Sequence, residues 1–234
     1  MTKYNNYDFQ KFSDQFSKLE AFELLKIMIK KFFFRKIVVT SSFGAESVVI
    51  LHLVSKIDKS IPIIFLNTGK LFPETLDYLK NVKKILKLKN IKIQKPDFKD
   101  LKLNDPKGNL HKSNPDLCCK IRKVIPLQKA ISNYDAWING RKRFHGSDRK
   151  NIRKIEKQNN IIKINPLANW SFKDIASYIN INSLPVHPLV KKGYKSIGCY
   201  PCTTKISDNE PKRGGRWKNS EKTECGIHTY NPLI

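Results

Sequence analysis

Short runs of β-branched and apolar residues alternate with amphipathic segments along most of this chain, and this alternation restricts the fold more than any other feature. Strands that alternate with helices build a parallel sheet with helices on both faces. We therefore predict an α/β fold, doubly wound around a mostly parallel five-stranded sheet. The predicted strands cover residues 36–41, 61–66, 91–94, 135–140 and 161–166. The predicted helices cover residues 8–31, 46–57 and 171–181, with Ser171 as the N-cap of the last and another helix beginning at Pro73.

The chain from about Leu184 onward is rich in Pro, Gly and charged residues, and it shows neither the helical nor the strand pattern of apolar residues. We expect an α/β nucleotide-binding domain at residues 1–183 and an irregular C-terminal tail at residues 184–234, both within one functional unit. The tail contains three of the five cysteines, at positions 199, 202 and 225.

The formal net charge of +25 would suit a nucleic-acid-binding protein. However, the lysines are spread over many helix faces instead of gathering on one, so we expect no dedicated nucleic-acid partner. No stretch approaches the roughly eighteen consecutive apolar residues of a membrane span, and the first residues lack the apolar core of a signal peptide. We expect a cytoplasmic protein with no membrane partner, whose cysteines serve metal binding or redox chemistry and not structural disulfides.

Three predicted strands end in turns that are rich in hydrogen-bonding groups. Ser41–Ser47 follows the first strand, Leu66–Gly69 ends the second, and residues 139–143 end the fourth. Backbone amides and hydroxyls at such turns hold phosphates, and Gly44 would allow a close approach. Because parallel strands end at the same edge of a sheet, three such turns favour a nucleotide site over ordinary connections.

Four cysteines form two pairs, Cys118-Cys119 and Cys199-x-x-Cys202. An iron–sulfur cluster accepts this spacing, whereas an adjacent pair fits a tetrahedral zinc site poorly. A thioredoxin-type dithiol at Cys199–Cys202 lacks the usual strand and helix around it. The cluster is the leading interpretation, zinc is the second, and buried structural thiols remain an alternative.

The fifth cysteine, Cys225, follows a basic segment that contains Arg213 and Arg216, and His228 lies three residues after it. Cationic neighbours favour the thiolate and attract anions. Cys225 is therefore a candidate nucleophile, although a single cysteine in such a position is often idle.

Together these motifs resemble those of the assimilatory adenylyl-sulfate reductases, in the phosphoadenylyl-sulfate (PAPS) reductase family of the PP-loop adenine-nucleotide superfamily. The resemblance extends from about Val38 to His228. It is carried by the blocks Cys-Cys-x-x-Arg-Lys at 118–123, Gly-Tyr-x-Ser-Ile-Gly-Cys-x-Pro-Cys-Thr at 193–203, Arg-x-Gly-Arg-Trp at 213–217 and Glu-Cys-Gly-Ile-His at 224–228.

The resemblance implies roles for individual residues. Cys225 would be the nucleophile, and Cys118, Cys119, Cys199 and Cys202 would bind a 4Fe-4S cluster. The substrate would contact the three turns, cations at the family's phosphosulfate-binding positions and the last histidine. These residues are Ser42, Gly44, Leu66, Thr68, Gly69, Lys123, Gly140, Arg143, Arg213, Arg216 and His228. Two departures from the family pattern, Asn67 for Asp and Asn139 for Thr, keep hydrogen-bonding capacity.

The resemblance also implies an activity. Adenylyl sulfate would be reduced to sulfite and AMP through an S-sulfonate on Cys225, and a separate thioredoxin or glutaredoxin would release the sulfite. Three alternatives stay open: reduction of the 3′-phosphorylated substrate, a PP-loop ATP-pyrophosphatase acting on tRNA, and a zinc-containing nucleic-acid-binding module. A homo-oligomer is compatible with the sequence.

Overall fold

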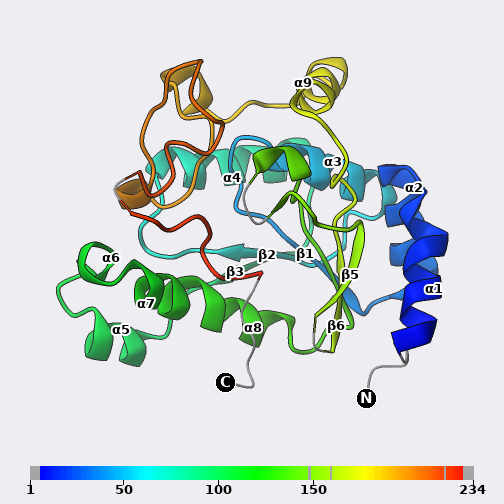
Figure 1. Ribbon diagram of the computed structural model, residues 1–234, viewed down its shortest axis with the longest axis horizontal. Helices are drawn as coiled ribbons and strands as arrows, with labels where there is room; N and C mark the ends of the chain where they lie inside the picture. Colours follow the sequence, from blue (N-terminus) through cyan, green and yellow to red (C-terminus); the bar gives the residue numbers. More distant parts are fainter. Residues whose placement is uncertain (1–5, 147–148, 159, 219, 229–234) are drawn as a thin grey trace.

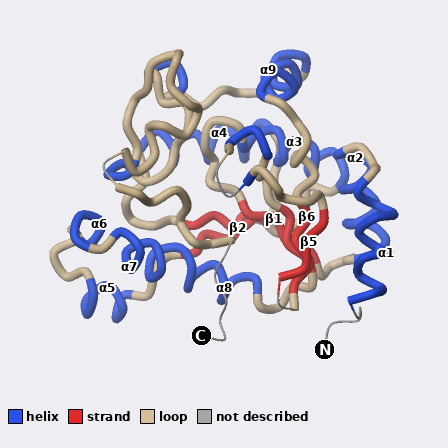
Figure 2. The backbone as a smooth tube through the Cα atoms, in the orientation of Figure 1, coloured by secondary structure: helices blue, strands red, loops and turns tan. Residues whose placement is uncertain are grey.

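A computed structural model describes residues 6–146, 149–158, 160–218 and 220–228. A central sheet lies between helices on both faces, and the tail forms a lobe of loops near the carboxyl ends of the strands (Figure 1; Figure 2). The predicted α/β class and mostly parallel sheet are confirmed. None of the described helices has the length and apolar character needed to cross a membrane.

The sheet has six strands in the order β3-β2-β1-β4-β6-β5, one more than predicted. The additional strand, β5, pairs antiparallel with β6 at the edge of the sheet. Its last three residues, Glu156 to Gln158, are polar, so the sequence lacks the β-branched run of a buried strand. The strands are β1 (Ile37–Thr40), β2 (Ile63–Leu66), β3 (Ile91–Gln94), β4 (Ala136–Ile138), β5 (Ile155–Gln158) and β6 (Ile161–Ile164).

Most helices pack on one face of the sheet, where a large apolar core buries the residues that the sequence marked as strands and helix faces. These helices are α1 (Asn6–Ser17), α2 (Ala21–Ile27), α3 (Ser47–Ile57), α4 (Pro73–Ile85) and α9 (Phe172–Ile181). Ser171 caps α9 as predicted, because its hydroxyl accepts from the Asp174 amide and the Asp174 carboxylate accepts in return.

The single helix predicted over residues 8–31 is instead two helices, α1 and α2, and the second continues into a π-helical turn, η1 (Met28–Phe32). The break allows α1 to fold back, so that Phe12 and Phe16 contact Phe32 with ring centroids 5.1 and 5.0 Å apart. On one straight helix, Phe16 and Phe32 would lie about 24 Å apart. Aromatic packing therefore outweighs the local periodicity.

The opposite face is covered by α8 (Ile125–Ile131), which packs with Val38, Ile64 and Trp137. A series of short helices, which the sequence did not predict, precedes α8 and carries the first cysteine pair (Figure 1). These are α5 (Phe98–Asn104), α6 (Leu110–Ser113), α7 (Pro115–Cys119) and the π-helical η2 (Lys120–Val124). Short 3-10 turns occur in the loops at η3 (Arg143–His145), η5 (Val190–Lys192) and η6 (Tyr200–Cys202).

Candidate active site

A cavity of about 240 Å³ lies where β1, β2 and β4 end and where the tail folds over them. Parallel strands bring the loops that follow them to one edge, which explains why three segments distant in sequence form one wall. Of the residues predicted to contact substrate, this wall contains Ser42, Gly44, Leu66, Thr68, Lys123, Gly140, Arg213, Arg216 and His228, together with the predicted nucleophile Cys225.

The loop after β1 forms a tight turn held by its own side chains. Phe43 is fully buried in the left-handed region at φ 47°, and its amide donates to Ser41 Oγ at 3.1 Å. A Cβ atom added to Gly44 would lie 3.1 Å from the carbonyl oxygen of Ile197. Glycine is therefore needed here for contact with the tail, in addition to any role toward a phosphate.

Glu46, in the same loop, is a site residue that the sequence analysis did not identify. Its carboxylate lies 2.7 Å from Lys142 Nζ and 3.2 Å from His145 Nε2. Burial alone would raise the pKa of Glu46, but Lys142 and His145 outweigh it and lower the pKa to about 2. Its partners lie about a hundred residues further along the chain, so no local pattern reveals the pair.

The loop after β2 connects the cavity to the second cysteine pair. The Thr68 hydroxyl lies 3.2 Å from Cys199 Sγ, and the Thr68 carbonyl accepts from Arg122 Nη1 at 2.7 Å. Arg122 is held in turn by the buried carboxylate of Asp105 at 2.5 Å. Gly69, at φ 72°, faces Arg122 and does not line the cavity.

The loop after β4 presents cations to the cavity, but not the one predicted. Arg141 and Lys142 line the wall, whereas Arg143 donates through Nε to the carbonyl of Ile152 at 2.8 Å and does not line it. Arg149 also lines the wall. The run Arg-Lys-Arg gives no sign of which member faces inward, because the chain enters a 3-10 turn there.

The two cysteine pairs lie close together although they come from separate segments. α7 begins after Asn114, whose side chain accepts from the Leu117 amide at 2.9 Å, and its last residues are Cys118 and Cys119. In the tail, Cys199 directly precedes η6 and Cys202 is the last residue of η6.

All four thiols are buried or half-buried and reduced. Burial raises the pKa of Cys118, and the charges of Cys199 and Cys202 contribute to that rise. Within the described residues, no three His, Cys, Asp or Glu side chains gather tightly enough for a single metal ion. The two pairs nevertheless lie near enough to each other for the charges of Cys199 and Cys202 to act on the thiol of Cys118.

Lys123, one turn after Cys119, lies close to the paired cysteines and also to Cys225. Burial would lower the pKa of its ammonium group, but Cys199, Cys225 and Cys119 outweigh burial and raise the pKa. Burial would raise the pKa of the Cys199 thiol, but Lys123 and the Thr68 hydroxyl outweigh burial and lower this pKa. Lys123 therefore lies at the junction of the cysteine group and the cavity.

The two arginines of the tail are held by different parts of the site. Arg213 Nη2 donates to the Thr223 carbonyl at 2.9 Å, two residues before the predicted nucleophile Cys225. Arg216 Nε donates to the Cys202 carbonyl at 3.2 Å, and its guanidinium lies over the Trp217 ring at 4.4 Å. A Cβ atom on Gly198 would lie 2.4 Å from Arg216 Nη2, so the glycine before Cys199 makes room for this side chain.

His228 is fixed against the sheet. Its ring stacks on Trp137 at 5.0 Å with an angle of 7° between the planes, and its carbonyl accepts from Lys163 Nζ at 2.7 Å. Burial and the nearby cations Arg141 and Lys163 lower the pKa of His228 well below its ordinary value. The imidazole is therefore neutral at physiological pH.

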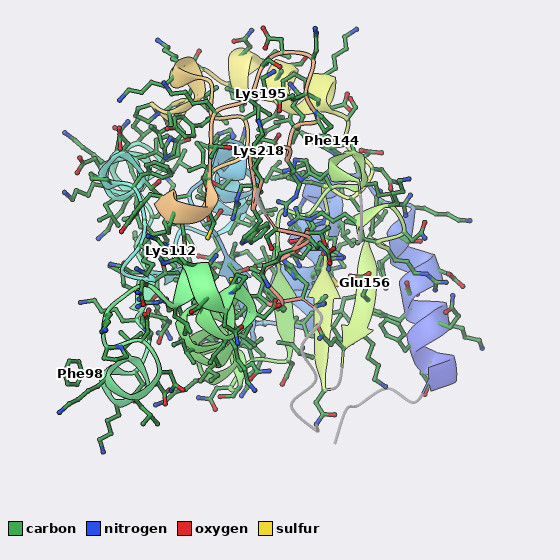
Figure 3. All side chains as sticks on the ribbon, turned by 60° about the vertical axis from the view of Figure 1, so that its left-hand side comes forward. Phe98, Lys112, Phe144, Glu156, Lys195 and Lys218 are labelled. Atoms are coloured by element: carbon green, nitrogen blue, oxygen red, sulfur yellow. The ribbon has the colours of Figure 1, made fainter. Side chains whose placement is uncertain are left out.

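The wall of the cavity is strongly positive. Seven lysines and arginines line it, including Lys195 on the tail lobe (Figure 3), against only two carboxylates, Glu46 and Glu224. Burial and the neighbouring Arg149 lower the pKa of Arg213 to about 10, which still leaves it charged at neutral pH. A surplus of five positive charges, in a wall that also contains Cys199 and Cys225, makes the cavity a site for a multiply charged anion.

Comparisons with known proteins agree with this geometry. The family model described as the phosphoadenosine phosphosulfate reductase domain matches residues 36–205. The chain is 44% identical to the adenosine 5′-phosphosulfate reductase of Mesorhizobium japonicum over 91% of this chain and 84% of that protein. It is 46% identical to the enzyme of the same name from a Chelativorans species, over 82% and 78% of the two chains.

A solved structure has the same fold. The PAPS reductase of Candida auris, in a phosphate complex, superposes with a TM-score of 0.74 at 30% identity, covering 86% of this chain and 98% of that one. The family match covers most of this chain, and the relatives are well above 30% identity over most of their length. This chain belongs to the phosphoadenosine phosphosulfate reductase domain family.

Proposed function

We propose that this protein reduces adenylyl sulfate to sulfite and AMP in sulfate assimilation. One observation carries the proposal: Cys225 shares a cavity with Lys123, Arg213 and Arg216 where β1, β2 and β4 end. The names of the curated relatives support the same reaction. An anionic substrate, a thiol and a surplus of cations are what attack on a sulfonyl phosphate requires.

In the first step, the Cys225 thiolate attacks the sulfonate sulfur of adenylyl sulfate. A sulfur–sulfur bond forms, the bond between that sulfur and the phosphate oxygen breaks, and AMP leaves with the electron pair. The product on the protein is an S-sulfonate of Cys225. Charge repulsion between thiolate and substrate opposes this approach, and Lys123, Arg213 and Arg216 offset it while stabilising the charge that develops on the phosphate.

In the second step, an external dithiol supplies two electrons. One of its thiolates attacks Cys225 Sγ and expels sulfite, and the second thiol resolves the mixed disulfide to regenerate the Cys225 thiol. We propose thioredoxin or glutaredoxin as this donor. Because both cysteine and dithiol must remain reduced, the cytoplasm is the proposed location.

We further propose that Cys118, Cys119, Cys199 and Cys202 bind a 4Fe-4S cluster. The four thiols are the donors that such a cluster uses, and they lie close together at the junction of α7 and the tail. When bound, the cluster would link these two segments and add negative charge beside Lys123. It need not carry electrons, because the dithiol supplies both.

Iron content and colour test the cluster. The anaerobically purified protein should be brown and contain about four irons per chain. Replacing any one of the four ligands by serine should remove the visible absorbance, whereas Cys225→Ser should keep it. A colourless, zinc-loaded and active protein would contradict the cluster.

Intact mass spectrometry tests the reaction. After anaerobic incubation with adenylyl sulfate and no dithiol, the protein should gain the mass of one SO3 group, on the peptide that contains Cys225. Thioredoxin should then remove the adduct and release sulfite. An adduct on Cys199 or Cys202 would show that the cysteines have been assigned the wrong roles.

The 3′-phosphorylated substrate is a second candidate. The Candida auris relative is a PAPS reductase, and the cavity has cations that could bind an additional phosphate. Competition between the two nucleotides, described in the Discussion, separates these candidates.

A further inference from the structure

An unbroken chain of polar contacts joins the loop after β1 to the residue that precedes Cys225. Glu46 lies 3.2 Å from His145 Nε2, and His145 Nδ1 lies 3.1 Å from Arg149 Nη1. Arg149 then binds the carboxylate of Glu224 with two bonds, Nε to Oε1 at 2.5 Å and Nη2 to Oε2 at 3.0 Å. The side chains of Glu46, His145, Arg149 and Glu224 are each no more than 14% exposed.

The chemistry of arginine fixes the direction of this chain. A guanidinium group only donates hydrogen bonds, so His145 Nδ1 must be the acceptor and its proton must lie on Nε2, which faces Glu46. One neutral tautomer of His145 therefore satisfies both neighbours. A protonated imidazole would place an N–H group against the guanidinium of Arg149 and break the contact.

Glu224 is otherwise difficult to explain at this position. A carboxylate next to the nucleophile opposes the approach of an anionic substrate, which is the reverse of what the surrounding cations do. Arg149 neutralises it through two parallel bonds, and Arg213 Nη2 lies 3.3 Å from it as well. The negative charge of Glu224 is thus fully paired with arginines, which indicates that Glu224 holds the chain next to Cys225 in place.

We propose that Glu224 and Arg149 are positioning residues that seat Cys225 for attack, and that His145 and Glu46 extend this contact to the loops that form the nucleotide wall. The proposal depends on the proposed function only in taking Cys225 as the nucleophile. Residues 220–228, here called the nucleophile segment, have little secondary structure of their own. The position of this segment therefore depends on side chains that reach it from the loops at the ends of the strands.

Hydrogen exchange on the purified, anaerobic protein tests this without turnover. Glu224→Gln should accelerate exchange in the peptide 220–228 by roughly tenfold or more, because one charged bidentate contact is lost. Exchange in β1 and α3 should stay as in the wild type. The matched control is Glu221→Gln, since Glu221 is exposed in the same segment.

A double-mutant cycle with Arg149→Gln measures the pair itself. The double variant should exchange no faster than either single variant, because each removes the same contact. Additive acceleration, or equal exchange in Glu224→Gln and Glu221→Gln, would overturn the proposal. General acceleration across the sheet would equally overturn it, since the role would then be stability of the whole fold.

Single-turnover kinetics connects positioning to chemistry. Glu224→Gln should slow S-sulfonation by roughly tenfold while the affinity for AMP stays within a factor of about two. A wild-type protein that forms no S-sulfonate would contradict the proposed function, whereas the exchange measurements would still decide whether Glu224 holds this segment.

Discussion

The two halves of the cavity are built in different ways. The sheet half consists of loops anchored at both ends by strands and helices, and many of its hydrogen bonds are local, as between Ser41 and Phe43. The tail half has little regular structure and is held by side chains that reach it from the sheet edge, such as Arg149 on Glu224 and Trp137 on His228. Under the proposed function, the sheet half is therefore preformed for a nucleotide, whereas the tail half carries the groups for sulfur chemistry on a segment that only a few contacts position.

The largest expected effect comes from removing the thiol of the tail half, which should stop the reaction without weakening nucleotide binding by the sheet half. Cys225→Ser should abolish sulfite release and the SO3 adduct, because a serine hydroxyl at neutral pH is a much weaker nucleophile than a thiolate. Binding of AMP, measured by calorimetry, should remain close to that of the wild type, since the sheet half is unchanged. A variant that loses AMP binding as well would show that the halves are not independent.

Removing one tail cation should give the next largest effect. Arg213→Ala and Arg216→Ala should each slow S-sulfonation by roughly a hundredfold, because each removes a donor that stabilises developing charge in a water-poor site. Rapid-quench measurement of the adduct would show this. Arg153→Ala provides the control, since Arg153 is exposed and lies outside the cavity wall; equal slowing there would point to net charge instead.

The sheet half should determine which nucleotide is used. The two substrates differ by a phosphate on the ribose, remote from the sulfur, so Cys225 cannot distinguish them. The curated relatives that cover most of this chain are named adenosine 5′-phosphosulfate reductases, and we predict that kcat/KM favours adenylyl sulfate by at least about tenfold, or 1.4 kcal/mol. Competition in one assay with thioredoxin would measure this ratio, and equal use of both nucleotides would contradict it.

The same contrast explains what the sequence could predict. Strand runs, the Ser171 cap and the turns after β1, β2 and β4 are local patterns, and the structure contains them where they were predicted. The blocks around Cys118, Cys199 and Cys225 also lie at one site. These features depend on residues near one another in the chain.

The missed features depend on partners far apart. Glu46 meets His145 across about a hundred residues, and Arg149 meets Glu224 across 75. Arg141 lines the cavity wall and Arg143 does not, because Arg143 begins the 3-10 turn η3 and its side chain binds the Ile152 carbonyl instead. One available signal was Glu224, a carboxylate directly before Cys225 in a tail rich in lysine and arginine, which implies a cation to neutralise it.

The smallest expected effect tests the contact between the halves through pH. His145 faces Glu46, Lys142 and Arg149, and its pKa is lowered from 6.5, with burial as the largest cause. Between this lowered pKa and 6.5, the unfolded chain binds a proton at His145 that the folded protein does not. The free energy of unfolding is therefore highest above about pH 6.5 as far as His145 is concerned, and it falls as pH decreases through that window, by at most about 1.4 kcal/mol per pH unit.

His145→Gln removes this titration while retaining one donor and one acceptor for Glu46 and Arg149. We expect the difference in urea unfolding midpoints between wild type and His145→Gln to be constant above about pH 6.5 and to shift against the wild type below it. The ratio of their kcat/KM values should follow the same course by a few-fold. A ratio that does not vary with pH would mean that the charge of His145 does not affect the position of the nucleophile segment.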